Sequence, residues 1–410
     1  MKKLMILGGS RYVLPVIKAA HELGVYVITC DYLPDNIAHR YSDEYCNVSI
    51  IEKEAVLEKA VELKIDGITS FACDPGVVTA AYVAEKMGLP SVGSYESVSI
   101  LQNKGKFRRF LAENGFNVPK ARSYSDAETA MKDIDYFNWP IIAKPVDSAG
   151  SKGVIKVTDT NRLSEAIHIA IDNSFNGEFI IEDYLESVGA PSDSDAFSVD
   201  GDLKFVSFNA QLFDDEASNP HTPAGFYWEP TISADHQEEL KTELQRLISL
   251  LNLKDSLYNI ETRECVDGKA YIMECSPRGG GNRLSECLEM ATGVKLIENA
   301  VRASLGMETV GLEQKPYDGL WAEAILHSDK EGLFEGIEIS PLLDPYIVEK
   351  DLWIKPEQRI REFTGANETI GTLILKFPDS NQMESIMKKI KEHIHIKVKE
   401  PVGNLVRGGV

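Results

Sequence analysis

The sequence contains no uninterrupted apolar stretch of the roughly 20 residues that a helix needs to cross a bilayer. The apolar run Leu4–Gly9 is also too short for the core of a secretory signal, and Met-Lys-Lys leads directly into it. We therefore expect a cytoplasmic protein that has no membrane partner.

Cysteine is scarce, and its spacing lacks the patterns that bind metal or build a disulfide framework. Six cysteines are scattered over 410 residues without a Cys-x-x-Cys pair, so zinc fingers and disulfide scaffolds are excluded. Positively charged residues are also few: the sequence has 43 Lys and Arg but 64 Asp and Glu, so its net charge is −21. Non-specific nucleic-acid binding requires a positive surface, so we expect no nucleic-acid partner.

What the sequence does contain is enough apolar material for about three domains, with 43% apolar and 26% charged residues. Alternating strand and helix patterns over residues 1–102 predict a doubly wound parallel α/β domain. Helix patterns interspersed with hairpin-forming strand patterns predict a central domain over 103–306, with an A subdomain at about 103–180 and a B subdomain at about 181–306. Residues 307–410 predict a small α+β C-terminal cap.

The first domain offers one candidate anion site. Gly8-Gly9-Ser10-Arg11 opens a predicted helix, whose N-terminal amides can hold an anion. Asp31 ends the second strand about 20 residues later, where dinucleotide-binding folds keep a ribose-binding acid. The complete glycine fingerprint is missing, because Tyr12 and Val13 occupy the positions of its last glycine. An NAD-dependent oxidoreductase therefore stays only an alternative.

The stretch LYNIETRECVDGKAYIMECSPRGGGNR, from Leu257 to Arg283, predicts a β-hairpin that turns at Asp267-Gly268. A two-residue turn there places Glu261 opposite Glu274, and Asn259 opposite Ser276 on the same face. Facing Cβ atoms lie roughly 5 Å apart, and two carboxylates so close require a shared cation or proton. Such an oxygen-rich pair suits magnesium. A β-bulge would disturb this register, and an exposed hairpin without a role is the alternative.

Two segments between residues 141 and 185 are candidates for nucleotide binding. DSAGSKG joins two predicted strands, and its small residues let backbone amides approach phosphate oxygens, although it is not a P-loop. Lys144 ends the preceding strand and adds a fixed positive charge. In EFIIEDYLES, Glu182 can accept a hydrogen bond from a flat base, and Asp183 to Leu185 can supply backbone groups. We expect segment 214–229, which is polar and turn-rich, to be a mobile or substrate-facing loop.

In their order and spacing, these segments resemble the ATP-grasp superfamily over roughly residues 1–306. LPDNIAHRYSD and ECSPR are similar to the purine-biosynthesis branch, and the whole resembles the carboxylate–amine ligases, including L-amino-acid ligases. The resemblance implies an ATP-grasp fold and the cofactors ATP and Mg²⁺, with Mn²⁺ as a substitute. It implies a ligase that forms an acylphosphate from a small-molecule carboxylic acid and joins it to an amine or thiol, releasing ADP and phosphate. A homodimer is compatible with it.

The resemblance also implies roles for individual residues. Catalysis would depend on Arg278, Lys144 and Lys152. ATP would be bound by Lys104, Lys144, Ser148, Gly150, Ser151, Gly153, Val154, Glu182, Asp183, Tyr184 and Leu185, with Asp193 or Asp195 at the ribose. Metal would be bound by Glu261, Glu274 and Ser276. The substrate would contact Gly9, Ser10, Arg11, Asp74, Gly280, Gly281, Asn282 and Arg283.

Two features depart from the family's pattern, and two alternatives stay open besides the oxidoreductase. The usual ribose-binding glutamate is not obvious, which leaves Asp193 and Asp195 as candidates. Most members have Asn at the position of Ser276, and a serine hydroxyl is a weaker metal ligand; the formate-dependent transformylase branch also has Glu-x-Ser-Pro-Arg. The alternatives are a bicarbonate-using carboxylase of the biotin carboxylase type and a non-catalytic nucleotide-binding protein. The acid and the amine are not readable from the sequence, since a free amino acid, a sugar-linked acid and a purine precursor all fit.

Overall fold

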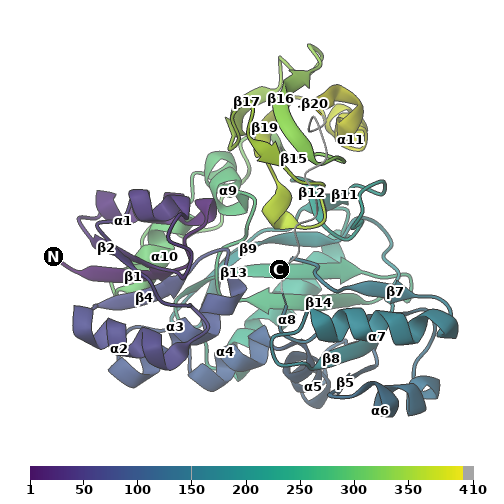
Figure 1. Ribbon diagram of the computed structural model, residues 1–410, viewed down its shortest axis with the longest axis horizontal. Helices are drawn as coiled ribbons and strands as arrows, with labels where there is room; N and C mark the ends of the chain where they lie inside the picture. Colours follow the sequence, from purple (N-terminus) through teal and green to yellow (C-terminus); the bar gives the residue numbers. More distant parts are fainter. Residues whose placement is uncertain (149, 400–410) are drawn as a thin grey trace, which may run out of the picture. The chain divides into compact units, whose positions relative to one another are not determined.

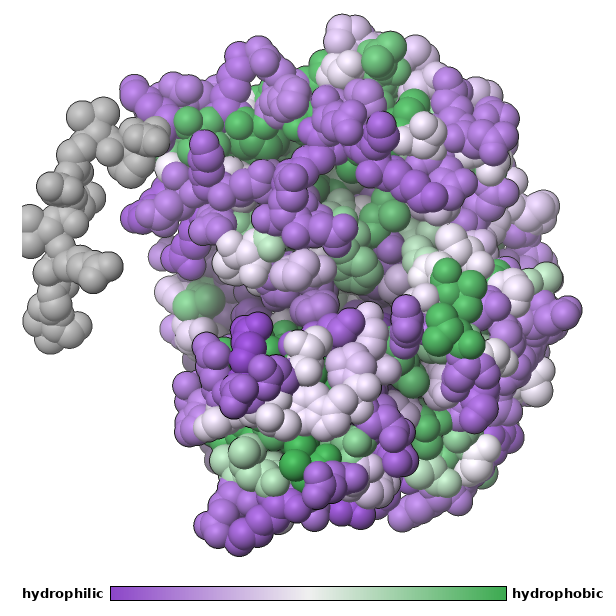
Figure 2. Space-filling view, turned by 90° about the vertical axis from the view of Figure 1, so that its right-hand side faces the viewer, coloured by the Kyte–Doolittle hydropathy of each residue, from purple (hydrophilic) through white to green (hydrophobic). Residues whose placement is uncertain are grey.

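The computed structural model describes residues 1–148 and 150–399 (Figure 1). These residues form two compact units: the first contains 1–209 and 230–317, and the second contains 210–229 and the described residues from Asp318 onward. The face shown in Figure 2 is mostly hydrophilic with small hydrophobic patches, as the large net charge leads one to expect. No helix in the described residues combines the length and the apolar character that crossing a bilayer requires.

The N-terminal part of the first unit is the predicted parallel α/β domain. Its sheet has the order β3-β2-β1-β4, and every neighbouring pair is parallel. The strands are β1 (Lys3–Leu7), β2 (Tyr26–Cys30), β3 (Glu44–Cys46) and β4 (Gly67–Ser70). The helices are α1 (Leu14–Glu22), α2 (Lys53–Leu63), α3 (Asp74–Met87) and α4 (Tyr95–Gln102), with short 3₁₀ helices η1 (Arg11–Val13) and η2 (Ile37–Arg40). Helix α1 lies on one side of the sheet, and α2 and α3 lie on the other (Figure 1).

A four-stranded antiparallel sheet with the order β5-β8-β6-β7 follows. Its strands are β5 (Ala121–Tyr124), β6 (Ile141–Pro145), β7 (Ile155–Val157) and β8 (Phe179–Asp183). The accompanying helices are α5 (Lys104–Glu113), α6 (Ala127–Lys132), η3 (Ile134–Tyr136), η4 (Thr160–Arg162) and α7 (Leu163–Asp172). In α7 the buried residues recur at helical spacing and pack into the same core as Ile141 and Ile181, which fixes this helix on the sheet.

A second antiparallel sheet has the order β10-β9-β13-β14. Its strands are β9 (Ser192–Val199), β10 (Asp202–Val206), β13 (Ser256–Glu264) and β14 (Ala270–Ser276), and α8 (Ala234–Leu250), α9 (Leu284–Thr292) and α10 (Leu296–Ser304) complete the first unit. Leu240, Leu244 and Leu247 of α8 share a buried core with Ile260 and Ile272. Since side chains alternate along a strand, the opposite face of β13 is left for Asn259, Glu261 and Arg263.

The turn of the β13–β14 hairpin differs from the predicted one. The Cys265 amide donates to the Lys269 carbonyl at 2.9 Å, so three residues, 266–268, form the turn, and Gly268 takes a positive φ of 77°. A third residue is accommodated because glycine adopts this φ without steric cost. Pairing next to the turn is therefore one residue out of the predicted register, with Glu264 opposite Ala270.

A β-bulge restores the predicted pairing farther from the turn. Thr262 still faces Ile272, but the next pair is Glu261 with Glu274, so Met273 is the extra residue. Asn259 then faces Ser276. The predicted pairs are confirmed, whereas the two-residue turn was wrong; the longer turn and the bulge each shift the register by one residue and cancel.

The second unit is a mixed α+β body. Its sheets have the orders β11-β12-β15-β19-β17 and β18-β16-β20. The elements are β11 (Ala210–Phe213), β12 (Pro223–Tyr227), β15 (Leu320–Leu326), β16 (Gly332–Ile339), β17 (Ile347–Leu352), β18 (Arg359–Ile360), η5 (Ala366–Glu368), β19 (Gly371–Phe377), α11 (Ser380–Met387), η6 (Ile390–His393) and β20 (Ile394–Lys399). The expectation that 214–229 is entirely loop was wrong, because β12 lies within it and buries Phe226 and Tyr227 against β15.

Candidate active site

Three carboxylates form a row across the polar face of the second sheet. Asp193 of β9 pairs with Glu261 of β13, which pairs with Glu274 of β14. The adjacent row on the same face contains Asp195, Asn259 and Ser276. Facing residues in antiparallel strands have Cα atoms about 4.5–5.5 Å apart. The two glutamates that the sequence pairs therefore share a face with a third acid.

Lys104 connects Glu274 to the glycine-rich loop. Its Nζ lies 3.1 Å from Glu274 Oε1 and donates a 2.9 Å hydrogen bond to the Ser148 carbonyl. The lysine begins α5, whose N-terminus is capped by the Asn103 side chain. Burial alone would raise the pKa of Glu274, but the charges of Lys104 and Lys144 hold it below its usual range. The carboxylate is thus kept ionised.

The other two acids of the row are stabilised less completely. Glu261 pairs with Arg263 at 2.9 Å, and Asp193 accepts a 2.7 Å hydrogen bond from Asn259 Nδ2. Burial, and then the nearby charge of Glu261, raise the pKa of Asp193 to about 7. A bound cation would relieve this repulsion, so the row fits a divalent ion with oxygen ligands.

Arg278 is held at the end of β14 by an acid of the first domain. Its Nε and Nη2 donate to the two oxygens of Asp74 at 2.9 and 2.7 Å, and its Nη1 donates to Asn259 Oδ1 at 3.0 Å. Burial would raise the pKa of Asp74, but the Arg278 charge lowers it. The Ser276 hydroxyl donates to Asp74 and accepts from Gln102, both at 2.7 Å. A metal-ligand role for Ser276 would require these bonds to rearrange.

Lys144 and Glu182 form a buried ion pair together with Arg108. Lys144 Nζ contacts Glu182 Oε1, and Arg108 Nε donates to Glu182 Oε2 at 2.9 Å. Burial would raise the pKa of Glu182, but the two cations lower it to about 2. Both carboxylate oxygens of Glu182 are therefore occupied by ion pairs. The sequence predicts that this carboxylate accepts a hydrogen bond from a base, but in the structure neither oxygen is unoccupied.

The end of β8 and the two residues after it make polar contacts at Asp183 and Tyr184 and an apolar contact at Leu185. The Asp183 carboxylate accepts hydrogen bonds from the backbone and side chain of Asn138 at 2.8 and 2.7 Å, and the Tyr184 ring lies 3.5 Å from Lys156 Nζ. Leu185 packs against a small cluster of Cys265, Tyr271 and Met273. The bulged residue Met273 thus lies beside the segment that the sequence assigns to adenine, and single-sequence patterns carry no signal for it.

The glycine-rich loop adopts a conformation that few residues tolerate. Gly150, Ser151 and Gly153 have φ values of 67°, 58° and 70°. A Cβ at Gly153 would lie 2.8 Å from Asn173 Cβ, so this glycine is also needed for close packing. Lys152 and Val154 belong to the same loop, where Lys152 is exposed. Ala149 lies outside the described residues.

The predicted substrate residues come together in part. The Tyr12 hydroxyl, next to the Gly9-Ser10-Arg11 turn, donates to Asn282 Oδ1 at 2.9 Å. Gly280 N donates to Asp195 at 3.0 Å, and Gly281 has open space around its Cα. The Arg283 side chain is buried and pairs with Glu286 of α9 at 3.1 Å, so it is not presented to solvent as an open anion site.

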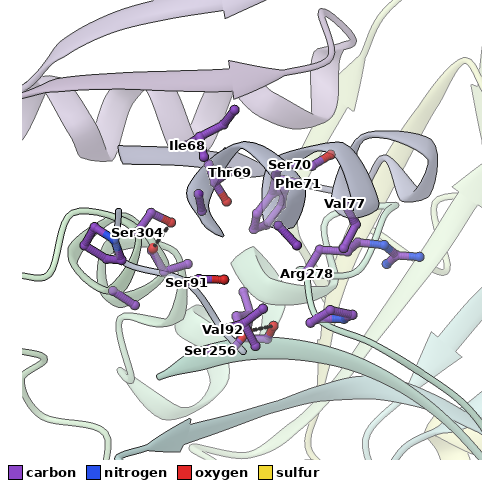
Figure 3. A pocket seen from close by; sticks show the side chains of 18 of the residues that line it. Ile68, Thr69, Ser70, Phe71, Val77, Ser91, Val92, Ser256, Arg278 and Ser304 are labelled. Atoms are coloured by element: carbon purple, nitrogen blue, oxygen red, sulfur yellow. Dashed lines mark hydrogen bonds between the residues drawn. The ribbon is translucent and has the colours of Figure 1, made fainter. Parts of the chain in front are cut away.

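A cavity of about 510 Å³ lies beside the carboxylate row, within the range of small-molecule sites. Among its lining residues are Glu52, Lys53, Asp74, Tyr95, Lys104, Asp147, Ser148, Phe175, Glu274 and Ser276. A second cavity of about 70 Å³, shown in Figure 3, lies between Phe71, Ser256 and Arg278 and has room for a few water molecules only. The larger cavity is the candidate substrate chamber.

Comparison with known proteins identifies the central domain. Residues 137–286 match the model of the ATP-grasp domain. Residues 137–286 thus form an ATP-grasp domain, as the order of the motifs predicts, and the predicted fold class is confirmed by a solved structure that shares the fold. Its carboxylate row and lysines lie within or next to the matched region.

Relatives of known sequence and structure differ in what they do. The carbamoyl phosphate synthase large chain of Thermoanaerobacter sp. is 27% identical over 284 residues, covering 67% of this chain and 24% of that protein. The chain spans less than half the length of the curated relatives it matches. Among solved structures, L-amino acid ligase from Bacillus licheniformis has a TM-score of 0.80 at 18% identity, covering 98% of this chain and 99% of that one.

The biotin carboxylase domain of Hydrogenobacter thermophilus 2-oxoglutarate carboxylase has a TM-score of 0.74 at 16% identity, covering 97% of this chain and 91% of that one. Its structure contains MgADP and bicarbonate. The predicted cofactors, ATP and Mg²⁺, agree with this complex. At these identities the structures establish the fold, and the reaction must be argued from the residues.

Proposed function

We propose that this protein is an ATP-dependent ligase that activates a carboxylic acid as an acylphosphate and joins it to an amine, or to a thiol, with release of ADP and phosphate. The observation that carries the proposal is the pairing of Glu261 with Glu274 beside Lys104, at the wall of a cavity that Asp74 also lines. A cation site, a phosphate-binding lysine and space for a substrate are thereby adjacent.

ATP would lie between the two antiparallel sheets. Leu185 and Met273 would contact adenine, with backbone groups of residues 183–185 at its edge, and Asp193 is the candidate for the ribose. Lys104 and Lys144 would neutralise phosphate oxygens, and the amides of loop 148–154 would cover them. Lys144 would have to divide its charge between the phosphates and Glu182.

Glu261 and Glu274 would hold Mg²⁺ or Mn²⁺, whose charge would offset the negative charge that develops on the phosphate oxygens. The remaining steps belong to the chain. Lys104 would leave Glu274 and bind the transferring phosphoryl group, and loop 148–154 would exclude water from the acylphosphate. Arg278 would stabilise the oxyanion that forms when the amine attacks the acyl carbon.

The lining of the cavity favours a polar substrate with an apolar part. Tyr95 and Phe175 contribute aromatic surface, and Glu52 is an acid suited to an ammonium group, whereas both oxygens of Asp74 are already bonded to Arg278. Lys53 and Lys104 belong to this lining, and Arg278 is bonded to Asp74 of the same lining; Lys53 and Arg278 would receive the carboxylate of the acid. We propose that the acid and the amine meet in this cavity, with the amine on the acidic side.

A carboxylase that activates bicarbonate is a second candidate, because the neighbour from Hydrogenobacter thermophilus was solved with bicarbonate and shares the fold. The two candidates differ in the acid that is activated. One assay therefore tests both: ATP, Mg²⁺ and a panel of carboxylic acids and amines, with ¹³C-bicarbonate in a parallel series.

The ligase predicts phosphate release that requires both an acid and an amine, and a product whose mass is their sum less one water. Incorporation of ¹³C would instead favour the carboxylase. Absence of any acid-dependent ADP formation across the panel, with folded protein, would argue against both.

A further inference from the structure

Arg108 is a buried arginine that the proposed chemistry does not use. It lies in α5, one turn after Lys104, and is only 3% exposed. Its Nε donates to Glu182 of β8 at 2.9 Å, and its Nη1 donates to the Met273 carbonyl of β14 at 2.8 Å. Nη2 has no hydrogen-bond partner among the described residues. One guanidinium thus spans the two antiparallel sheets.

The carbonyl that Arg108 binds belongs to the bulged residue. Met273 is the residue that the β13–β14 ladder skips between the pairs Thr262–Ile272 and Glu261–Glu274. An extra residue leaves its backbone groups outside the ladder, where an unpaired buried carbonyl is costly. Arg108 supplies the missing donor, and its positive charge makes the bond stronger than a neutral one.

The position of this bulge decides which way Glu274 points. Between the turn and Thr262 the strands keep the register that the three-residue turn sets, from the pair Glu264–Ala270 to the pair Thr262–Ile272. Had that register continued, Glu274 would face Ile260, whose side chain lies in the core beneath the sheet. A one-residue slip moves a side chain to the opposite face. Without the bulge, Glu274 would therefore point away from Glu261 and Lys104.

The second contact of Arg108 acts on Lys144. Glu182 accepts from Arg108 with one oxygen and contacts Lys144 with the other. The orientation of this carboxylate, and with it the position of the Lys144 ammonium group, depends on the arginine. The same side chain therefore orients one phosphate-binding lysine and one metal-binding carboxylate.

We propose that Arg108 is a positioning residue that holds the bulge at Met273, keeps Glu274 on the metal-binding face and fixes Lys144 through Glu182. The inference rests on the proposed function, since it assigns Glu274 to the metal. Its distinguishing consequence is a loss of divalent-ion affinity that is larger than the loss of affinity for nucleotide alone.

The test compares Arg108→Met with Arg108→Lys, and uses Arg109→Met as the control, because Arg109 is the next residue and is exposed. Electron paramagnetic resonance measures Mn²⁺ binding in the presence of ATP, and a fluorescent ATP analogue measures nucleotide binding without metal. We expect Arg108→Met to weaken Mn²⁺ binding at least tenfold and nucleotide binding no more than threefold. In Arg108→Lys a single ammonium group replaces a guanidinium that bonds to both Glu182 and the Met273 carbonyl. We therefore expect this variant to lose Mn²⁺ affinity at least threefold, and we expect no loss of Mn²⁺ affinity in Arg109→Met.

The outcomes separate the inference from the function on which it rests. Failure of the wild-type protein to bind Mn²⁺ with ATP contradicts the proposed function. Wild-type binding together with unchanged Mn²⁺ affinity in folded Arg108→Met contradicts the role of Arg108. If Arg108→Met does not fold, Arg108→Lys decides: an unchanged affinity there overturns the proposal, and a selective loss of Mn²⁺ binding supports it.

Discussion

The guanidinium of Arg278 and the carboxylate of Asp74 share two hydrogen bonds, of 2.9 and 2.7 Å, that join the end of β14 to the start of α3. This pair connects the parallel domain to the hairpin that is proposed to bind metal, and it orients the arginine that the proposed mechanism places at the acyl carbon. Planar, two-point pairing of this kind fixes the position of an arginine more tightly than a single bond.

Replacing Asp74 by Ala should therefore lower kcat more than it raises the KM for ATP. A hydrogen bond to a charged group contributes about 1.5–3 kcal/mol, which corresponds to roughly a 10- to 150-fold loss in rate if Arg278 is misplaced in the transition state. Steady-state ADP release measures both constants. A raised KM for ATP with unchanged kcat would contradict this role for Asp74.

Neutralising either glutamate of the facing pair should abolish Mg²⁺-dependent ATP turnover. In Glu261→Gln or Glu274→Gln an amide replaces a charged ligand, so we expect activity to fall about 100-fold or more while circular dichroism stays unchanged. The matched control is Glu238→Gln on the exposed face of α8, which should keep full activity. Wild-type rates of Mg²⁺-dependent ADP release in either site variant would refute the metal assignment.

The glycines after Arg278 should differ sharply in their tolerance of a methyl group. A Cβ at Gly279 would lie 2.3 Å from Phe71 Cε2, one of the residues around the small cavity in Figure 3, whereas nothing lies within 4 Å of a Cβ at Gly281. We expect Gly279→Ala to lower the free energy of unfolding by about 1–3 kcal/mol and Gly281→Ala to change it by less than about 0.5 kcal/mol. Urea denaturation measures both, and equal effects would contradict the packing described.

Asp195 should make the protein less stable as pH rises. Burial raises its pKa to about 6, although hydrogen bonds from Ser285 and the Gly280 amide limit the rise. An unfolded aspartate titrates near about 3.9, so between about pH 4 and pH 6 the folded chain retains a proton that the unfolded chain has lost. Stability therefore falls across this interval and stays lowered above it, by roughly 3 kcal/mol at most.

Asp195→Asn removes that titration. The unfolding free energy of the wild-type protein relative to this variant should decrease between pH 4 and pH 7, as measured by urea denaturation at several pH values in metal-free buffer. A difference that is constant over this interval, or that grows with pH, would show that Asp195 is not a protonated buried acid.

The sequence predicts the parallel domain and the antiparallel strands, because apolar periodicity is a local signal. The predicted pairing of Glu261 with Glu274 is confirmed only because the longer turn and the bulge shift the register in opposite senses. The sequence does not predict the three-residue turn, where the Val266 amide donates to the Glu186 carbonyl, or the bulge at Met273, whose carbonyl accepts from Arg108 of α5, because both contacts are distant in sequence. The strand at Pro223–Tyr227 was missed for a related reason. It pairs with the nearby β11 and with β15, which lies almost a hundred residues later, and the polar residues between β11 and β12 hid the strand pattern.

Individual side chains of the site were harder to predict than its strands. Lys104, Lys144 and Glu182 were found from family-like spacing, but the engagement of Glu182 by Arg108 appears only when α5 packs against both sheets. Ser276 lies where a metal ligand was predicted, yet its hydroxyl is bonded to Asp74 and Gln102. Hydrogen bonds between segments separated by more than a hundred residues have no signature in a single sequence.

The central claim is that the substrate's own carboxylate accepts the γ-phosphoryl group, and oxygen transfer tests it most directly. An acid that supports ADP release is labelled with ¹⁸O in both carboxylate oxygens, turned over with ATP and its amine partner, and the released phosphate is analysed by mass spectrometry. One ¹⁸O should appear in each phosphate, because the oxygen bridging carbon and phosphorus leaves with phosphate when the amine attacks. Unlabelled phosphate from a reaction that forms the amide product would contradict acylphosphate chemistry, because the oxygen lost from the acid would then have left by another route.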